Sequence, residues 1–205
     1  MPELLVDLLR HGEPEGGSRF RGRTDDILTD QGWAQLRTAV PKQPPWEQII
    51  TSPAKRCAVF AEELATMHQL PHIKEEWLWE MDFGDWDGLT AAEITSKDAN
   101  WLSTFWQDPT SHTPPGGEPF LQFKQRVLNG WNQLIKQPAN RILLISHGGP
   151  IRLILAEVLG MPVHNLMRLE VPYAALSQVR VSIDDAGTCH YSLCTHNQQP
   201  DTNRK

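Results

Sequence analysis

RILLISHGGP, residues 141–150, is the stretch that decides the fold class, because it joins a buried strand directly to a helix. RILLIS is a nearly unbroken apolar run, which is typical of a central strand covered on both faces. His147 and two glycines follow it, and Pro150 is expected to open a helix that stops at Gly160, before Pro162. A strand that runs straight into a helix indicates an α/β protein with a mostly parallel sheet.

Strands and helices are predicted to alternate along most of the chain. Thr29 is expected to cap one helix, and Ser52 another that has Pro53 at its first position. Thr90 and Glu93 form a capping box that opens a third helix. The predicted strands are 4–9, 46–51, 71–77, 141–146 and a terminal hairpin of 178–183 with 189–193. The predicted helices are 28–40, 52–68, one that opens near 91, 119–137 and 150–160. The fold class is therefore α/β, a three-layer sandwich whose mostly parallel central sheet is flanked by helices.

The chain is expected to form one domain over residues 1–195, followed by a polar tail at 196–205 that frays from Thr195. Residues 90–118 interrupt the strand–helix rhythm and are rich in Trp and Pro. They are predicted to be a small helical, lid-like insertion over one edge of the sheet, with extra packing and no ligand role as the open alternative.

Composition excludes several classes of protein. The 205 residues are 40% hydrophobic and 21% charged, which is ordinary for a globular protein, and the net charge of -6 argues against a general nucleic-acid binder. No run approaches the ~18 apolar residues of a membrane helix, so no membrane partner is expected. Three cysteines make no disulfide framework, and acids at Glu3 and Asp7 argue against a signal peptide. We therefore expect a cytoplasmic protein.

Cations and imidazoles follow three of the predicted strands at their carboxyl ends. The first strand ends on Arg10 and His11, the second leads into a helix whose first turn carries Arg56, and RILLIS ends on His147. Ligands bind at this edge of open α/β sheets, and arginine grips a tetrahedral oxyanion through two bonds at once. Each of these residues alone is more often structural, but together they predict an anion site for which phosphate is the best fit.

Five motifs in order resemble the histidine phosphatase superfamily, which has the phosphoglycerate-mutase-like fold. They are LLRHGEP, TSPAKRC, EMDFGDWDG, GGEPF and ISHGGP, and the resemblance runs from about residue 4 to residue 193. It implies that His11 is the nucleophile that becomes a phosphohistidine, which requires a neutral imidazole. It also implies that Arg10, Arg56 and His147 bind the phosphoryl oxygens and that Glu80 is the proton donor.

The resemblance also assigns substrate contacts of lower specificity. Gly148 lies at the phosphate pocket, and Glu118 matches a position near it, although a carboxylate that simply favours a helix start is an equal alternative. Spacing alone leaves three rival acids beside Glu80, which are Asp82, Asp85 and Asp87. The aromatic side chains expected to desolvate the acid are Trp77, Trp79, Phe83 and Trp86. The loop SRFRGRTDD contributes the specificity candidates Arg21, Arg23 and Thr24.

Neither a cofactor nor a metal is implied, because arginine and histidine supply the positive charge. Cys189 and Cys194 lie on opposite faces of a predicted strand, which argues against a zinc site there. The only partner implied is a small phosphorylated substrate. The sequence does not determine the oligomeric state, and a homodimer is compatible with it.

Length and motif detail narrow the implied reaction. Only about 37 residues separate Glu80 from Glu118, which favours a phosphatase over the longer phosphoglycerate mutases. The closest resemblance is to the α-ribazole-5′-phosphate phosphatases of cobalamin biosynthesis, and Trp101, Phe105 and Trp106 are candidates to stack on a benzimidazole. The alternatives are a broad-specificity or sugar (bis)phosphate phosphatase, a mutase and a catalytically silent binding module.

Overall fold

A six-stranded sheet forms the centre of the computed structural model, which describes residues 3–198 of the chain. The strand order is β3-β2-β4-β1-β5-β6. Strands β1 to β4 are parallel to one another, and β5 and β6 add an antiparallel hairpin beside β1. The strands are β1 (Glu3–Arg10), β2 (Gln48–Thr51), β3 (His72–Lys74), β4 (Arg141–Ser146), β5 (Leu176–Ile183) and β6 (Cys189–Gln198). The α/β fold with a mostly parallel sheet is confirmed.

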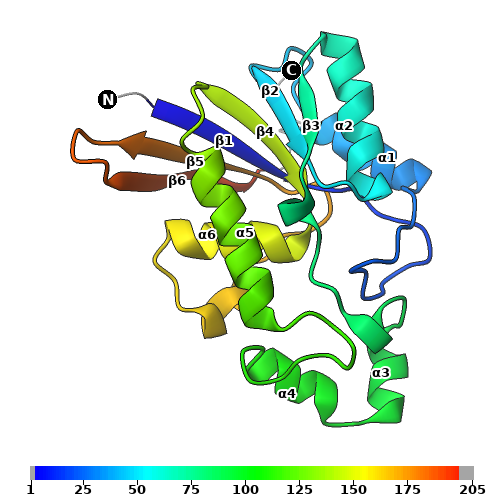
Figure 1. Ribbon diagram of the computed structural model, residues 1–205. Helices are drawn as coiled ribbons and strands as arrows, with labels where there is room; N and C mark the ends of the chain where they lie inside the picture. The colour runs from blue at the N-terminus through cyan, green and yellow to red at the C-terminus, as the bar shows by residue number, and fades with distance from the viewer. Residues whose placement is uncertain (1–2, 199–205) are drawn as a thin grey trace.

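Helices cover both faces of the sheet, with α1 and α2 on one side and α5 and α6 on the other (Figure 1). Successive residues of each central strand point to opposite faces. Leu9 therefore packs with Leu36 and Phe60 of the first helix layer, whereas Leu8 packs with the second layer, which includes Val127 and Ile154. The helices of the two layers are α1 (Asp30–Ala39), α2 (Lys55–His68), α5 (Phe120–Leu134) and α6 (Gly148–Val158).

The register of the parallel strands brings the predicted site residues together. Arg10 pairs with Ser146 across β1 and β4, so the next residues, His11 and His147, leave the same edge side by side. The backbone N–H of His11 continues the ladder by donating to the carbonyl of Ser146 at 3.0 Å. Strand β2 pairs with the other side of β4, and Ser52 donates its N–H to the carbonyl of Ile145 at 2.9 Å.

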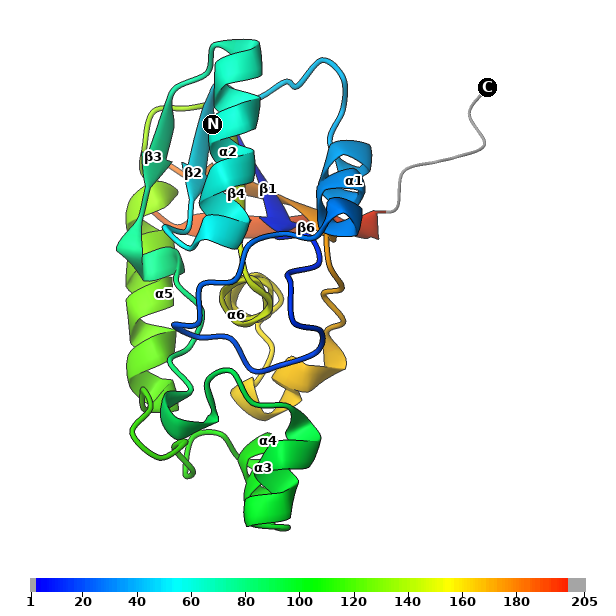
Figure 2. The same ribbon diagram turned by 90° about the vertical axis from the view of Figure 1, so that its right-hand side faces the viewer.

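Two segments extend beyond this edge. Residues 11–29 form a long loop that surrounds the end-on outline of α6 in Figure 2, and an isolated bridge between Pro14 and Leu28 closes it. The insertion contains α3 (Ala91–Lys97) and α4 (Trp101–Gln107), which lie beyond the carboxyl ends of the strands (Figures 1 and 2). The predicted capping box of α3 is present, with Thr90 and Glu93 bonding each other's backbone N–H groups.

Several predicted boundaries are wrong. Helix α2 begins at Lys55, because the Ser52 hydroxyl accepts only the N–H of Ala54, at 3.3 Å, while the cap position itself has no side-chain bond. Strand β3 stops at Lys74, and a 3₁₀ turn (Glu76–Leu78) follows it. Helix α6 begins two residues before Pro150.

The carboxyl-terminal hairpin is also longer than predicted. Strand β6 continues to Gln198, where it pairs with Leu176, so the chain does not fray at Thr195. This pairing includes residues 196–198 of the predicted tail. The rest of that tail, 199–205, lies outside the described residues.

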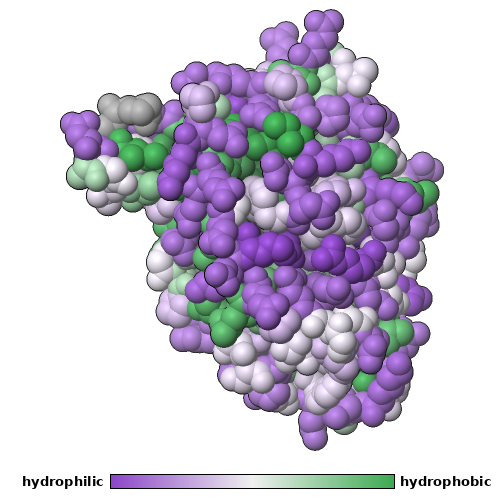
Figure 3. Space-filling model, in the orientation of Figure 1, coloured by the Kyte–Doolittle hydropathy of each residue, from purple (hydrophilic) through white to green (hydrophobic). Residues whose placement is uncertain are grey.

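The face seen in Figure 3 is mostly hydrophilic, and its hydrophobic residues form small separate patches. Within residues 3–198, no helix has the length and hydropathy needed to cross a membrane.

Candidate active site

His11 occupies the centre of the site and has the tautomer that a nucleophile needs. It is 4% exposed, and its Nδ1 lies 2.7 Å from the carbonyl oxygen of Gly12. A carbonyl oxygen only accepts, so Nδ1 carries the proton, and the lone pair of the neutral ring is left on Nε2. Gly12 cannot be replaced by a larger residue here, because a Cβ would lie 2.2 Å from the carbonyl oxygen of Gly32.

The surroundings of His11 keep its imidazole neutral. Burial lowers its pKa well below the ordinary value of 6.5, and the positive charges of Arg10 and Arg56 lower the pKa further. A neutral ring near pH 7 is the form that attacks phosphorus. A phosphate bound by these cations would therefore lie beside a neutral imidazole.

Arg10 has a hydrogen-bonding group that the described protein does not satisfy. Its Nη1 donates to the carbonyl of Val171 at 2.6 Å, and its guanidinium carbon lies 4.4 Å above the centre of the Tyr173 ring. Its Nε is buried and has no partner within residues 3–198. A buried cationic donor without a partner is costly, so this atom indicates a place for an anion.

Arg56, the second residue of α2, is fully buried and held on three sides. Its Nη1 donates to the carbonyl of Thr24 at 2.7 Å, and its Nη2 donates to the carbonyls of Arg21 at 3.0 Å and Gly22 at 3.4 Å. Its Nε donates to Nδ1 of His147 at 3.2 Å. Because a guanidinium has five N–H donors, one N–H on Nη1 is left for a ligand.

His147 is also held as a neutral ring. Since the Arg56 Nε can only donate, Nδ1 of His147 must accept, and the proton lies on Nε2, 2.8 Å from the Ser52 hydroxyl. Burial lowers its pKa well below 6.5, with Arg56 as the next cause. Its ring contacts His11 edge to face, with 5.2 Å between the ring centres. A phosphoryl oxygen would have to replace Ser52 as the partner of Nε2.

Glu80 lies at the N-terminus of α6, where backbone N–H groups hold its carboxylate. Its Oε2 accepts from Gly149 at 2.9 Å and its Oε1 from Met81 at 3.0 Å. A Cβ at Gly149 would lie 2.0 Å from Oε1 of Glu80, so a larger residue there would displace the carboxylate. The structure thus aims Glu80 at the helix end that follows His147.

The aromatic residues expected around Glu80 are mostly elsewhere. Trp77 packs on α5 at Gly130, Trp86 is buried against Phe105, and Trp79 stacks on the His147 ring with 6.5 Å between ring centres. Only Phe83 of the four lines the cavity beside Glu80. The prediction was wrong because residues 76–87 turn repeatedly, which sends neighbouring side chains to different parts of the molecule.

The three rival acids point to other partners. Asp82 lies 3.5 Å from the guanidinium of Arg23, Asp85 is exposed, and Asp87 accepts three backbone N–H bonds from the loop after β1. None of the three lines the cavity beside Glu80. Of the four carboxylates, only Glu80 therefore lines this cavity, a distinction that spacing alone did not make.

The predicted specificity residues have different environments. Arg21 is buried inside its own loop, where it bonds Asp26 at 2.7 Å. Thr24 contributes its carbonyl to Arg56, whereas Arg23 is half exposed and lies over the Trp79 ring at 5.1 Å. Of these three residues, Arg21 is buried, Thr24 is partly buried and Arg23 is the most exposed.

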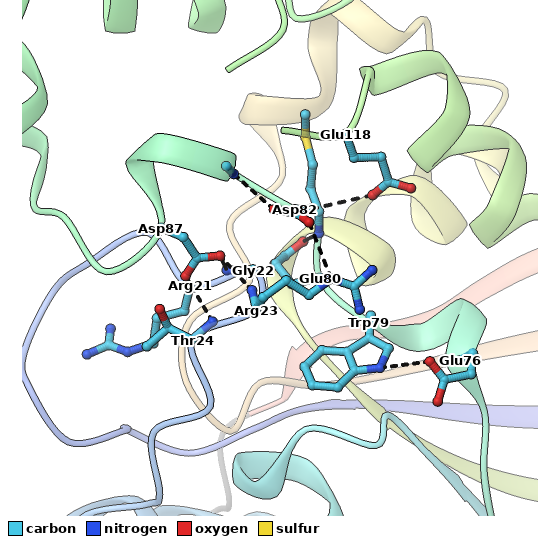
Figure 4. A network of polar contacts seen from close by, with 12 residues as sticks. Arg21, Gly22, Arg23, Thr24, Glu76, Trp79, Glu80, Asp82, Asp87 and Glu118 are labelled. Atoms are coloured by element: carbon cyan, nitrogen blue, oxygen red, sulfur yellow. Dashed lines mark hydrogen bonds and ion pairs between the residues drawn. The ribbon is translucent and has the colours of Figure 1, made fainter. Parts of the chain in front are cut away.

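Glu118 and Gly148 were the remaining candidates. Glu118 accepts the N–H of Asp82 at 3.4 Å (Figure 4). It also pairs with Arg126 at 2.8 Å. Arg126 in turn donates to the carbonyls of Trp77 and Trp79, so Glu118 supports the segment that leads to Glu80. Neither Glu118 nor Arg126 lines the cavity beside Glu80. Gly148 is the first residue of α6, and the guanidinium of Arg10 lies beside it.

A mainly apolar cavity of about 100 Å³ adjoins Glu80 and Gly149. One wall comes from the insertion, through Phe105 and Trp106, and Trp106 also stacks on Phe20 of the loop after β1. The opposite wall comes from the 3₁₀ turn Val163–Arg168 and includes Val163, Leu166 and Met167. Trp101 does not line the cavity and contacts Trp86 instead.

Sequence reasoning missed three residues of the site. Ser52 was interpreted only as a helix cap, yet it bonds His147. Tyr173 lies 5.6 Å from His11 between ring centres and under Arg10. Arg152, one helical turn after Gly148, lines the cavity and donates to the carbonyl of Leu169. Of these residues, only Arg152 had a usable signal in the sequence, because its spacing of four residues from Gly148 places both on one face of a helix. Tyr173 reaches the site only through a tertiary contact.

The comparison with protein families agrees with this geometry. Residues 6–190 match the histidine phosphatase superfamily (branch 1), and the chain belongs to this family. A solved structure, mycobacterial glucosyl-3-phosphoglycerate phosphatase, superimposes with a TM-score of 0.81 at 26% identity over 95% of this chain and 99% of that one. The phosphoglycerate-mutase-like fold implied by the motifs is thus confirmed.

Two relatives show how the family varies around this chain. A bifunctional protein of Mycobacterium tuberculosis is 33% identical over 187 residues, which cover 88% of this chain and 51% of that protein. The chain thus spans about half the length of that relative. An adenosylcobalamin/alpha-ribazole phosphatase of Salmonella typhimurium is 28% identical over 180 residues, which cover 85% of this chain and 89% of that protein.

Proposed function

We propose that this protein is a metal-independent phosphomonoesterase that works through a phosphohistidine at His11. The observation that carries the proposal is the unsatisfied Nε of Arg10 beside a neutral imidazole whose free lone pair is on Nε2. Arg10 and Arg56 supply the positive charge that a phosphoryl group needs as it is transferred.

The reaction has two balanced steps. Nε2 of His11 attacks phosphorus, the bond from phosphorus to the ester oxygen breaks, and protonated Glu80 gives its proton to that oxygen. A water molecule then attacks the phosphohistidine, its proton passes to the Glu80 carboxylate, and the N–P bond breaks to release phosphate. Arg10 and Arg56, and not a metal ion, bind the phosphoryl oxygens in both steps. We therefore expect chelators to leave the activity unchanged.

The first test is phosphate release in the presence of EDTA by the wild type and by His11→Ala. We expect the variant to lose at least 10³-fold in kcat, because no other neutral imidazole nitrogen is free at this position. Acid-quench trapping should give a phosphorylated wild type and no phosphorylated His11→Ala. A variant with full activity would contradict the mechanism.

For the substrate, we infer α-ribazole 5′-phosphate, whose benzimidazole would occupy the apolar cavity beside Glu80. Phe105 and Trp106 present aromatic surface there, next to the acid that protonates the leaving oxygen. The similarity to the Salmonella typhimurium enzyme supports the same substrate. A sugar phosphate with a second anionic group is the alternative, and the cation of Arg152 in the cavity wall favours it.

The substrate test compares kcat/KM for α-ribazole 5′-phosphate with values for 3-phosphoglycerate, phosphoserine, fructose 2,6-bisphosphate and nucleoside monophosphates. A lead of a hundredfold or more supports α-ribazole phosphate, whereas a lead for an anionic substrate supports the alternative. Trp106→Ala should raise KM for the preferred aromatic substrate about tenfold, since stacking contributes ~1 kcal/mol or more beyond area burial. Trp101→Ala is the matched control, because Trp101 does not line the cavity, and should leave KM unchanged.

A further inference from the structure

The carboxylate of Asp87 binds three consecutive backbone N–H groups of the loop after β1 (Figure 4). Its Oδ2 accepts from Gly22 at 3.0 Å and Arg23 at 2.6 Å, and its Oδ1 accepts from Thr24 at 2.9 Å. Asp87 lies more than sixty residues further along the chain, at the end of a short 3₁₀ turn (Gly84–Trp86). One side chain thus determines the backbone conformation of a distant loop.

Carbonyl groups of the same loop hold Arg56. The peptide group between Arg21 and Gly22 offers its oxygen to Arg56 and its N–H to Asp87. The next peptide group, between Gly22 and Arg23, does the same, with a longer bond to Arg56 of 3.4 Å. A negative and a positive side chain therefore lie at opposite ends of the same two peptide dipoles, an arrangement in which each hydrogen bond strengthens the other.

The loop is also pressed against the segment that carries the proposed acid. At Gly22 a Cβ would lie 2.2 Å from the carbonyl oxygen of Met81 and 2.8 Å from Oδ2 of Asp87. Glycine is therefore the only residue that fits between Asp87 and the backbone next to Glu80. The position of Asp87 is thereby linked to both halves of the site, the phosphate pocket through Arg56 and the proton donor through Met81.

We propose that Asp87 is a positioning residue that holds the loop 21–24 so that its carbonyls place the guanidinium of Arg56 in the phosphate pocket. Asp87 acts through Arg56, because its carboxylate is bound to three N–H groups of the loop and does not line the cavity beside Glu80. The proposal rests on the proposed function, since it assigns Arg56 to phosphate binding. A purely structural role predicts lower stability of Asp87 variants with unchanged affinity for phosphate.

The experiment measures binding of inorganic phosphate by calorimetry, at a temperature where circular dichroism shows each variant to be folded. Asp87→Ala should weaken phosphate binding at least tenfold, with a similar loss in kcat/KM. Asp87→Asn keeps one oxygen that can accept from Gly22 and Arg23, so it should recover part of the affinity. Asp85→Ala is the matched control, because it removes an equal charge from an exposed neighbour, and should stay within twofold of the wild type.

Phosphate affinity within twofold of the wild type in folded Asp87→Ala overturns the proposal, whatever its melting temperature. If Asp87→Ala does not fold, Asp87→Asn decides, and a loss of threefold or more supports the proposal while wild-type affinity overturns it. A second measurement combines Asp87→Ala with Arg56→Lys. If Asp87 acts through Arg56, the two losses in phosphate affinity are far from additive, and additive losses contradict this route.

The two proposals fail in different ways. A wild type that binds phosphate but hydrolyses no phosphomonoester contradicts the proposed function, and the affinities of the Asp87 variants still test the positioning role. Normal hydrolysis with unchanged affinity in Asp87→Ala contradicts only the role of Asp87.

Discussion

At the scale of single residues, the site depends on two imidazoles kept neutral by burial and by nearby guanidinium groups. His11 and His147 each have a pKa well below 6.5 in the folded protein, with burial as the largest cause. In the unfolded chain both would titrate near their ordinary value. The difference makes the protein's stability, as well as its chemistry, depend on pH.

The first prediction is that stability falls as the pH is lowered below 6.5. The folded-state pKa values are depressed, so the stabilisation is complete above 6.5 and is lost as the pH falls toward those values. Each histidine contributes at most about 1.4 kcal/mol of unfolding free energy per pH unit in that window. His11→Asn should therefore reduce the fall in unfolding free energy between pH 6.5 and 5.5 by about 1 kcal/mol, as measured by urea denaturation, because unfolded histidine is only partly protonated near its own pKa. Equal slopes in the two proteins would show that His11 is not held neutral.

A second residue-scale prediction concerns Gly149. The Cβ of Gly149→Ala would meet Oε1 of Glu80 at 2.0 Å and the ring of Phe123 at 2.9 Å. Because a carboxylate at the end of a flexible side chain can move aside, we expect a small loss of stability and a displaced acid. The kcat should fall by about 10²-fold, the usual contribution of a positioned acid, while phosphate still binds.

Steady-state kinetics of Gly149→Ala, measured in parallel with Glu80→Gln, would check this prediction. The double variant should be no worse than Glu80→Gln alone, because both changes remove the same group. Unchanged kcat in Gly149→Ala would mean that the proton comes from elsewhere.

At the scale of elements, Gly130 shows why a residue that is poor for a helix stands in the middle of α5. The indole of Trp77 packs directly on the helix backbone there, and a Cβ would lie 2.1 Å from the ring. Helix propensity alone predicts that alanine stabilises the helix by about 1 kcal/mol. Tertiary packing predicts the opposite sign, because the partly buried indole of Trp77 must move.

The third prediction is that Gly130→Ala destabilises the protein by about 1–2 kcal/mol. Overpacking costs roughly 1–3 kcal/mol, which exceeds the gain in propensity of about 1 kcal/mol. Thermal or urea unfolding measures the change. The control is Asn129→Ala in the same helix, which is exposed and should leave stability unchanged or slightly higher. A stabilised Gly130→Ala would show that Trp77 does not constrain α5.

At the scale of the whole molecule, a second polar centre lies within the sheet, away from the site. The carboxylate of Asp7 is buried and bonds Nε1 of Trp46 at 2.6 Å, Nε of Arg141 at 2.9 Å and Nε2 of Gln178 at 2.9 Å. Trp46 precedes β2, Arg141 begins β4 and Gln178 belongs to β5. The side chain of Asp7, on β1, therefore connects four parts of the sheet. Asp7 is four residues before His11 in an extended strand, about 13 Å along it.

The fourth prediction is that removing the Asp7 carboxylate lowers stability but leaves activity unchanged, because Asp7 lies away from the site. Asp7→Ala leaves the N–H of Trp46 and the cation of Arg141 without their partner, which should cost about 3 kcal/mol of unfolding free energy. At a temperature where the variant is folded, kcat/KM should stay within twofold of the wild type. A large loss of activity in the folded variant would mean that the sheet transmits the change to the phosphate pocket.

The sequence alone determined the framework of the molecule. Apolar runs such as Arg141–Ser146 and the residues directly after them predicted which side chains leave the carboxyl edge of the sheet, because strand direction and the period of two are local properties. Arg10, His11, Arg56 and His147 therefore lie together as expected. The motifs also named the family, since five short stretches in a set order are far more specific than any one of them.

Only the tertiary structure decided how those residues are held. The carbonyls that hold Arg56, the Ser52 hydroxyl that accepts from Nε2 of His147 and the three N–H groups on Asp87 all come from segments distant in sequence. Periodicity and propensity describe a residue and its neighbours along the chain, so they carry no information on such partners. Spacing along the chain did not distinguish Glu80 from three nearby carboxylates for the same reason. Only folding brings the N-terminus of α6 to Glu80.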